Sequence, residues 1–425
     1  MQKLFNYLSE GVSPFHVIAH TKKLLNEAGF TELMIKDPWS LAAGGKYYCA
    51  PFGTTLYAFT IGRDPDLSRG IHIGGAHTDY PVLKIKPAPD ISRHGYLQLN
   101  TEVYGGPILS TWFDRPLSVA GKVVTRGPEY DQPEVHLIDL KDPVICLPNL
   151  AIHMNREVND NGLPIDCQKM LLPFCGMAGE KMPEGAFMNL LADRIGVRAE
   201  DILDADLSIY NPQQPVLCGF DRAFIMSPRL DDVSSVSALI HGLIGSSHPS
   251  RVNMVCLFDN EEVGSLSKQG ADAVMPRVII NKIWQAFGRD PVACMSETAG
   301  GMMLSMDVAQ AFHPNFPEKQ DITNFPVLGG GVCLKSASNQ SYSWDAEMMA
   351  SIIDLCRREQ IPYQRAVKRS GVKGGGTIGS IISSQLPMRT ADIGIGLLAM
   401  HSSCETAGTG DYEALEKLAK VFFSK

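Results

Sequence analysis

The segment from Val252 to Phe258, VNMVCLF, is a nearly continuous apolar run with the length of a single strand. Such runs are typical of strands in a parallel sheet that is covered on both faces. The run ends abruptly in DNEE, which places the carboxylates of Asp259, Glu261 and Glu262 directly after it. Crowded carboxylates repel one another, so these side chains lie either in water on a turn or next to a positive partner.

Strands and helices alternate in the first and last parts of the chain. Residues 14–28, 229–247 and 344–361 have the apolar periodicity of helices, and RVNMVCLF, PYQRAV and ADIGIGLLAMHSS are expected to be strands. The chain closes with DYEALEKLAKVFFSK, a helix for which Asp411 is expected to be the N-cap. This alternation predicts an α/β domain.

The middle of the chain has a different pattern. Between about residue 89 and 215, short alternating strands such as LSVAGKVVTRG and PEVHLIDL are separated by Gly and Pro turns. We therefore predict an α/β catalytic domain in two parts, residues 1–88 and 216–425, interrupted by a smaller β-rich domain, residues 89–215.

Composition excludes several classes of partner. The formal net charge is −8 and there is no basic stretch, which argues against nucleic acid. The chain has no run of about 18 apolar residues that could cross a membrane. The first residues lack the pattern of a signal peptide. The ten cysteines, from Cys49 to Cys404, contain no CxxC pair, as expected of reduced thiols in the cytoplasm.

Acidic and imidazole side chains recur where apolar runs stop. Open α/β sheets bind ligands beyond the carboxyl ends of their strands, so the fold could unite these residues. Two imidazoles with several carboxylates suit divalent zinc, and a pair of ions about 3.5–4 Å apart would supply the compensating charge. The residues are His77, Asp79, Asp231, Asp232, Glu261, Glu262, Asp307 and His401.

Each of these residues has a simpler interpretation when taken alone. A Glu-Glu pair after a strand is usually a solvated turn. The sequence LDD before a helix is most simply an N-cap, and His401 would serve equally as a hydrogen-bonded core histidine. Their joint placement at strand ends is what favours a metal site. In a metal site, the adjacent Glu261 and Glu262 offer one ligand and one general base, and Asp79 would accept the imidazole N–H of His77 and fix its tautomer.

Six ordered motifs resemble those of the M18 metallo-aminopeptidases, the aspartyl aminopeptidase group. They are AHTDYP, SPRLDD, FDNEEVGSLSKQGA, SMDVAQAFHPNFPEKQD, GGGTIG and AMHSSCET, and the resemblance spans nearly the whole chain. It implies an α/β/α zinc-peptidase sheet with an inserted dimerisation domain. It also implies hydrolysis of the N-terminal peptide bond of small peptides with a free N-terminus, with a preference for Asp or Glu at that position.

The resemblance implies specific roles for the residues at strand ends. His77, Asp231 and Asp307 would hold one zinc, while Glu262 and His401 would hold the other, with Asp231 bridging the two. Glu261 would be the general base and later the acid, and Asp79 would orient His77. Cobalt or manganese are possible substitutes for zinc, since all three accept N and O ligands.

The resemblance also implies assembly into a homo-oligomer, built from dimers and possibly a dodecamer. His153, in NLAIHMNREVND, would reach the active site of a neighbouring subunit and stabilise the tetrahedral intermediate. The alternative is an ordinary surface or interface histidine.

A preference for acidic N-terminal residues requires a cation near the substrate. Lys335 is the leading candidate by its position in the family pattern; Lys368, Arg369 and Lys373 are other candidates, although a solvated loop is the simpler interpretation of those three. The chain departs from the pattern at Gln310, where a histidine is expected, and at Ser341, where an arginine is expected.

Three functional hypotheses follow. The first is an active dinuclear zinc aminopeptidase with an acidic preference, and the second is the same enzyme with a preference for neutral N-terminal residues. The third is a catalytically silent oligomeric shell that binds peptides. No metal ligand of the family pattern is missing from this chain, which favours an enzyme.

Overall fold

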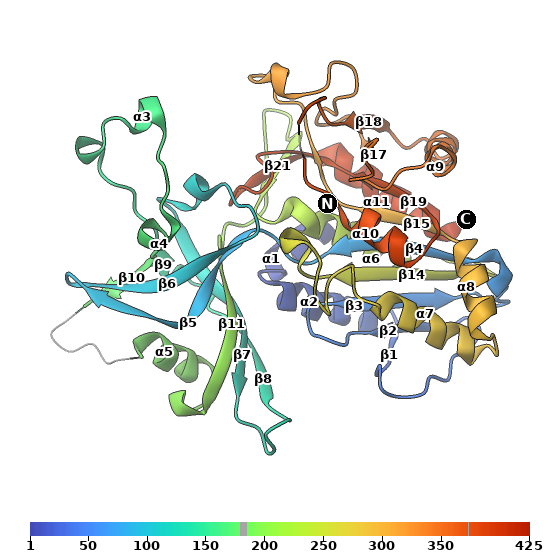
Figure 1. Cartoon of the computed structure of the whole chain (residues 1–425), viewed down its shortest axis with the longest axis horizontal. Helices are drawn as coiled ribbons and strands as arrows, with labels where there is room; N and C mark the ends of the chain where they lie inside the picture. The colour runs from blue at the N-terminus through green and yellow to red at the C-terminus, as the bar shows by residue number, and fades with distance from the viewer. Residues whose placement is uncertain (179–184, 373) are drawn as a thin grey trace. The chain divides into compact units, whose positions relative to one another are not determined.

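The computed structural model describes residues 1–178, 185–372 and 374–425, which form two compact units (Figure 1). The larger unit comprises Met1–Tyr80, Pro215–Met400 and Glu405–Lys425, and the smaller comprises Pro81–Gln214 with His401–Cys404. The sequence-based boundaries were 88/89 and 215/216. The smaller unit begins earlier because its first strand, β5, already starts at Val82 and runs to Arg93.

A nine-stranded sheet forms the centre of the larger unit. The segment VNMVCLF is strand β14, buried along its whole length, and it pairs in parallel with β4, which in turn pairs in parallel with β15. The order across the sheet is β1 (Thr31–Glu32), β2 (Lys46–Cys49), β3 (Leu56–Ile61), β14 (Val252–Phe258), β4 (Ile71–His77), β15 (Met302–Met306), β19 (Arg389–Gly394), β17 (Val332–Ser336) and β18 (Tyr363–Val367).

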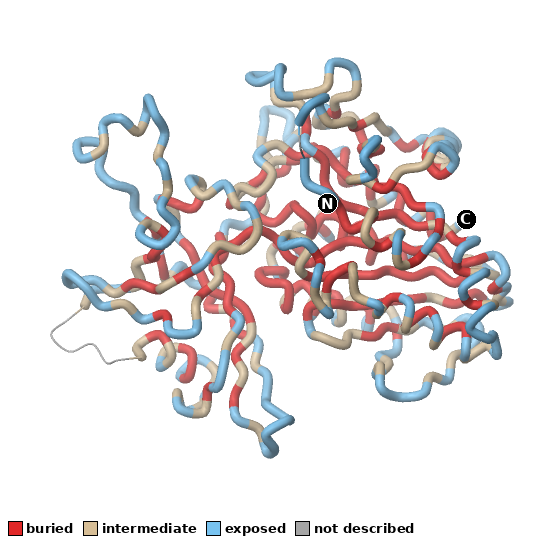
Figure 2. Tube along the Cα trace, in the orientation of Figure 1, coloured by how far each residue is buried: buried red, intermediate tan, exposed pale blue. Residues whose placement is uncertain are grey.

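Helices cover both faces of this sheet, as alternate residues of β14 demonstrate. Val255 and Leu257 belong to one hydrophobic cluster, and Met254 and Cys256 belong to the other. The first cluster includes side chains of α1 (Gln2–Glu10), α2 (Pro14–Glu27), α6 (Leu230–Ile244), α9 (Ala346–Arg358) and α11 (Thr409–Ser424). The second includes side chains of α7 (Met275–Ala286), α8 (Pro291–Ala299) and α10 (Ile378–Gln385). Figure 2 shows that the strands of this sheet are buried along most of their length.

A second, five-stranded sheet completes the larger unit. Its order is β12 (Val216–Cys218), β13 (Phe224–Ser227), β21 (Glu405–Gly408), β20 (Gly396–Leu398) and β16 (Ala309–Gln310). Strand β13 leads directly into α6, and β21 leads directly into α11.

The smaller unit is β-rich, and its strands pair antiparallel. The order is β11 (Ile202–Tyr210), β5 (Val82–Arg93), β6 (Tyr96–Tyr104), β10 (Phe174–Met177), β9 (Ile145–Cys146), β7 (Pro116–Thr125) and β8 (Glu134–Asp139). Strand β11 also pairs with β7, which closes the sheet into a barrel. Short helices α3 (Val158–Asn161) and α4 (Cys167–Met170) and the longer α5 (Ala186–Ile195) accompany it. The predicted α/β fold with an inserted smaller β-rich domain is confirmed.

Every helix in the described part of the chain is too short or too polar to cross a bilayer.

Candidate metal centre

The side chains of the candidate centre follow the carboxyl ends of three neighbouring strands of the larger unit. His77 is the last residue of β4, Asp307 follows β15, and Glu261 follows β14 in the short helical turn η5 (Glu261–Val263). Because Phe258 of β14 pairs with His77 of β4, the segments that leave these strands begin side by side. Parallel pairing therefore brings His77 next to segments that lie more than 180 positions later in the sequence.

His77 lies at the middle of a buried acidic cluster. Its Nε2 atom is 3.4 Å from Asp231 Oδ1, 3.8 Å from Asp307 Oδ1 and 3.9 Å from Asp232 Oδ2. One ligand atom from each of these four residues lies within 4.8 Å of the others, and His77, Glu261 and Glu262 form a second such group. The structure thus assembles one nitrogen and several oxygen donors around a common point.

The beginning of α6 supplies two of the carboxylates. Asp231 and Asp232 have non-helical backbone angles, and no side chain caps this end of the helix. The backbone N–H of Asp231 donates to Glu405 at 3.0 Å, and Asp232 accepts the backbone N–H of His77 at 3.2 Å. The alternative that these aspartates are simple N-caps is therefore wrong: Glu405 of β21 holds the Asp231 backbone, and the backbone of β4 holds the Asp232 carboxylate.

His77 is oriented so that Nε2 points to the carboxylates. Its Nδ1–H donates to the backbone oxygen of Asp79 at 3.0 Å, while the Asp79 carboxylate lies 3.4 Å from the same nitrogen. A proton held at Nδ1 leaves the lone pair of Nε2 available to a cation. The main chain of Asp79, more than its side chain, thus fixes the tautomer.

The Asp79 carboxylate has a separate task. Its two oxygens accept the backbone N–H groups of Glu261 and Glu262, each at 3.1 Å. The preceding Asn260 adopts a left-handed conformation, with φ of 62°, that turns the chain away from β14. Asp79 therefore fixes the acidic turn that the sequence places after VNMVCLF, and both glutamates are half-buried, unlike residues of a fully solvated turn.

Burial and like charge shift the protonation of this cluster. Burial, reinforced by the negative charges of Asp307, Asp79 and Asp231 against the opposing effect of His77, raises the pKa of Glu261 to about 7. Burial, with the nearby Asp307 and Asp231, also raises the pKa of Asp232 well above its usual range. Burial alone would lower the pKa of His77, but the surrounding carboxylates outweigh it and raise that pKa. A cation at this point would relieve the repulsion.

The donor set fits a divalent cation. Asp232 Oδ1 is buried and accepts no hydrogen bond within the described residues. Imidazole nitrogen and carboxylate oxygen are ligands that zinc takes in proteins. The buried carboxylates, together with the Asp232 oxygen that accepts no hydrogen bond, supply the oxygen ligands that a metal site requires.

Lys335 is a buried cation beside this cluster. It lies on β17 with 1% of its surface exposed, and its Nζ is 3.3 Å from Asp307 Oδ2. Burial would lower its pKa, but the charges of Asp307, Asp392 and Asp232 raise it instead. From the sequence, Lys335 is expected only to bind substrate. Apart from the residue types, the sequence gives no indication that Lys335 pairs with Asp307 or that Asp232 is buried.

Two further candidates, His401 and His153, belong to the smaller unit. His401 is in the smaller unit, where its Nδ1–H donates to Gly106 at 3.0 Å, and His153 is exposed in the turn η3 (Ile152–Met154) of that unit. Arg369 is exposed, Lys368 is half-buried, and Lys373 lies outside the described residues.

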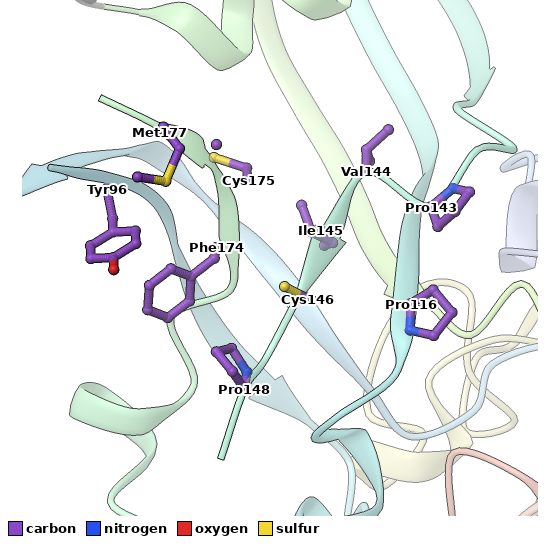
Figure 3. A pocket seen from close by; sticks show the side chains of 11 residues that line it. Tyr96, Pro116, Pro143, Val144, Ile145, Cys146, Pro148, Phe174, Cys175 and Met177 are labelled. Carbon is purple, nitrogen blue, oxygen red and sulfur yellow. The ribbon is translucent and has the colours of Figure 1, made fainter. Parts of the chain in front are cut away.

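The smaller unit also holds an apolar pocket of about 860 Å³. Figure 3 shows Tyr96 and Phe174 on one side of it and Pro116 and Pro143 on the other. Its full lining is Tyr96, Pro116, Pro143, Val144, Ile145, Cys146, Pro148, Phe174, Cys175, Gly176 and Met177. This lining contains no charged side chain and no predicted site residue.

Comparisons with known proteins agree on one family. The family model described as aminopeptidase I zinc metalloprotease (M18) matches residues 7–423. The chain is 40% identical over 425 residues to a probable M18 family aminopeptidase 2 of Clostridium acetobutylicum, covering 100% of this chain and 98% of that protein. It is 38% identical to a protein of the same description from Clostridium novyi, covering 99% and 98%.

Solved structures share the fold. A crystal structure of prApe1 superposes with a TM-score of 0.92 at 28% identity, covering 99% of this chain and 93% of that one. The S. cerevisiae mApe1 dodecamer gives 0.86 at 27% identity, covering 99% and 95%. An M18-family aminopeptidase from Thermotoga maritima gives 0.88 at 23% identity, covering 100% and 95%, which shows the fold alone.

Proposed function

Because the chain belongs to the M18 family of aminopeptidase I zinc metalloproteases, we propose that it removes N-terminal residues from small peptides with two zinc ions bound in each subunit. Family membership makes the chain a metallo-aminopeptidase, which is a peptide hydrolase. The number of ions, the preferred N-terminal residue and the roles of individual residues are the proposed parts.

We assign the metal ligands as follows. His77, Asp231 and Asp307 hold one ion, Glu262 and His401 hold the other, and Asp231 bridges them. The support is the convergence of His77, Asp231 and Asp307 with Glu262 in the larger unit. His401 enters through the sequence resemblance of AMHSSCET. When bound, the ions would polarise the scissile carbonyl and lower the pKa of a water molecule.

Glu261 is the proposed proton carrier. It takes the proton of the attacking water and returns it to the leaving amine. Its half-buried position beside the cluster and its pKa, which burial raises to about 7, suit a group that both gains and loses a proton near neutral pH. Asp79 holds the backbone of Glu261, so it acts as a positioning residue.

His153 is proposed to act in a neighbouring subunit of a homo-oligomer. It is exposed in this chain, as a residue that serves another subunit must be. Donation of a hydrogen bond to the developing oxyanion is worth about 2.7–4 kcal/mol where one such donor has been removed. A relative with the same fold is described as a dodecamer, and we propose a comparable assembly built from dimers.

The proposed preference is for Asp or Glu at the N-terminus. Lys335 is the proposed substrate-binding cation, and its position beside Asp307 places a positive charge next to the centre. Because the chain departs from the family pattern at Gln310 and Ser341, the preference for acidic N-terminal residues is proposed and tested separately from the reaction class. Gln310 is the last residue of β16 and is exposed.

The buried convergence on His77 is the observation on which this proposal depends. The test is a panel of aminoacyl-coumarin substrates together with metal analysis of the purified protein. We expect about two ions per chain, chelator-sensitive hydrolysis, and a higher kcat/KM for Asp than for Leu or Ala substrates. Metal below one ion per chain with no hydrolysis would favour the silent shell, and a preference for Leu or Ala would favour the neutral aminopeptidase.

A further inference from the structure

A small cavity lies at the edge of the nine-stranded sheet opposite the candidate metal centre. Strands β14, β4 and β15 run parallel and the metal centre follows their carboxyl ends, so their first residues share the other edge. Arg251 directly precedes β14, His72 is the second residue of β4, and Met302 is the first residue of β15. These three residues line a cavity of about 390 Å³, which residues of α9 and of the C-terminal end of α11 complete.

The acidic side chains of this cavity already have cationic partners. Asp354 Oδ2 is 2.7 Å from Arg358 Nε, one turn further along α9, and Glu359 Oε1 is 3.0 Å from Lys425 Nζ. Arg251 differs from these cations, because it forms no ion pair with a carboxylate in the described part of the chain. A half-buried guanidinium without a counterion leaves a positive charge that a bound anion would offset.

The hydrogen bonds of Arg251 leave part of its donor capacity unused. Its Nη1 group donates to Nε2 of His72, whose Nδ1–H donates to the backbone oxygen of Phe422 at 3.1 Å. The His72 ring, stacked on the Phe422 ring at 4.6 Å between centroids, is therefore a neutral acceptor and does not offset the guanidinium charge. The Arg251 Nε–H group is buried and has no acceptor among the described residues. A buried donor without an acceptor is costly, which favours a ligand that supplies one.

Further positive side chains gather at the same edge of the sheet. Arg69 lies two residues before β4, and its Nη1 group donates to Ser250 Oγ at 3.1 Å. Arg389 is the first residue of β19 and pairs with Met302, which in turn pairs with His72. Neither arginine forms an ion pair with a carboxylate within the residues that the structure describes. Burial, and then the charge of Arg69, lower the pKa of Arg251, as expected where like charges meet without an anion.

We propose that this cavity binds a small oxyanion, a carboxylate or a phosphate, and that the guanidinium of Arg251 is its principal partner. The planar fork of a guanidinium matches two oxygens of either group. Met302, Ile352, Leu355 and Phe422 line other parts of the cavity, so an apolar body attached to the anion would also be accommodated. The site shares no residue with the candidate metal centre, and the inference does not depend on the proposed aminopeptidase function.

The test is isothermal titration calorimetry of the metal-loaded protein with inorganic phosphate and with benzoate, each against sodium chloride of equal ionic strength. Arg251→Met removes the charge, Arg251→Lys keeps a cation without the planar fork, and Arg277→Met removes an exposed arginine of α7, on the other face of the sheet, as the matched control. We expect saturable binding of at least one probe by wild type. Arg251→Met should raise its Kd about 10- to 100-fold, the range for loss of a charged hydrogen-bond partner.

Arg251→Lys should bind with intermediate affinity, and Arg277→Met should bind as wild type does. Binding of phosphate alone would identify the ligand as a phosphate, and binding of benzoate alone would identify it as a carboxylate with an apolar body.

Melting temperature and metal content of each variant are measured alongside the titrations, so that misfolding is recognised. Saturable binding of neither probe by wild type would overturn the inference without recourse to any variant. Equal affinity in wild type and Arg251→Met would also overturn it. Binding that persists in Arg251→Met and disappears after chelation of the metal would place the anion at the metal centre instead, with the same consequence for this inference.

Discussion

The carboxylate of Asp79 accepts the backbone N–H of Glu261 at 3.1 Å, although 182 positions separate the two residues. Its second oxygen accepts the next N–H along the chain, from Glu262, at the same distance. One side chain on the loop after β4 thus sets the position of the acidic turn after β14. This contact places the proposed general base and a proposed metal ligand in one fixed arrangement.

Removal of the Asp79 carboxylate should therefore lower turnover by misplacing Glu261. We expect Asp79→Ala to reduce kcat about 10- to 100-fold, the effect of losing acceptors for two partly buried N–H groups. Asp79→Asn keeps one acceptor oxygen and should lose less. Steady-state kinetics with metal analysis checks this. If Asp79→Ala instead loses metal at unchanged kcat per bound ion, the residue acts through His77 and the positioning role is wrong.

Glu261→Gln should abolish proton transfer while the protein still binds metal. The amide is isosteric with the carboxylate but accepts no proton, so we expect kcat to fall about 10²- to 10⁴-fold. Metal content should equal that of wild type, because Glu261 is not a proposed ligand. Glu318→Gln, an exposed site in the turn η6 (Pro317–Lys319), is the matched control. A Glu261→Gln enzyme within threefold of wild type would exclude this residue as the base.

Metal content separates the two proposed ion sites. His77→Ala and His401→Ala should each lower the bound zinc from about two to about one ion per chain, since each removes the sole imidazole of its site. Inductively coupled plasma mass spectrometry of the dialysed proteins gives the count. His94→Ala, an exposed histidine of the smaller unit, serves as control. Full occupancy in His401→Ala would remove this residue from the ligand set.

Acid should destabilise the larger unit through His72. Burial and the adjacent Arg251 lower the pKa of His72 from 6.5 to about 3. Above pH 6.5 the residue is neutral in both the folded and unfolded states. As the pH falls from 6.5 towards 3, the unfolded state binds a proton that the folded state does not, so the free energy of unfolding falls by up to about 1.4 kcal/mol per pH unit.

His72→Gln should flatten this dependence, because glutamine binds no proton and can still donate to the backbone oxygen of Phe422, the present partner of His72 Nδ1. Urea unfolding at several values between pH 5 and 7 measures the slope, with His94→Gln as the exposed control. Equal slopes for wild type and His72→Gln would show that His72 is not neutral in the folded state over this range.

Asp411 tests a buried contact of the C-terminal helix. The expectation that it is the N-cap was wrong: α11 begins at Thr409, and the Asp411 carboxylate accepts the backbone N–H groups of Gly329 and Gly331 at 2.8 and 2.7 Å. Asp411→Ala leaves both without this acceptor and should cost about 2–4 kcal/mol of unfolding free energy. Denaturant melts measure it, and Glu413→Ala on the same helix is the control. A loss below 0.5 kcal/mol would mean that water replaces the carboxylate.

The fold class was predictable because hydrophobic patterning depends on residues near one another in the chain. The uninterrupted run VNMVCLF predicted a strand covered on both faces, and β14 has that environment. The short alternating strands in the middle predicted the inserted β-rich domain. The domain boundary was harder to place, since β5 runs continuously across residue 88 and no break in the sequence marks Tyr80.

Residue types and strand ends pointed to the acidic cluster, but the sequence could not give its contacts. Asp232, adjacent to the expected ligand Asp231, is equally buried beside His77, and the backbone oxygen of Asp79 takes the hydrogen bond that was expected for its carboxylate. Both contacts depend on which backbone atoms face inward at the end of a strand. That orientation follows from the register of β4 against β14.

By itself the sequence determined the strands, the helices and the supply of carboxylates and imidazoles at strand ends, because these follow from local periodicity and residue chemistry. Only the tertiary structure decided that Lys335 pairs with Asp307 and that Asp79 holds the Glu261 turn. Those pairings join residues from strands and loops far apart in the chain, and their distances are fixed by the order and register in which the strands pack.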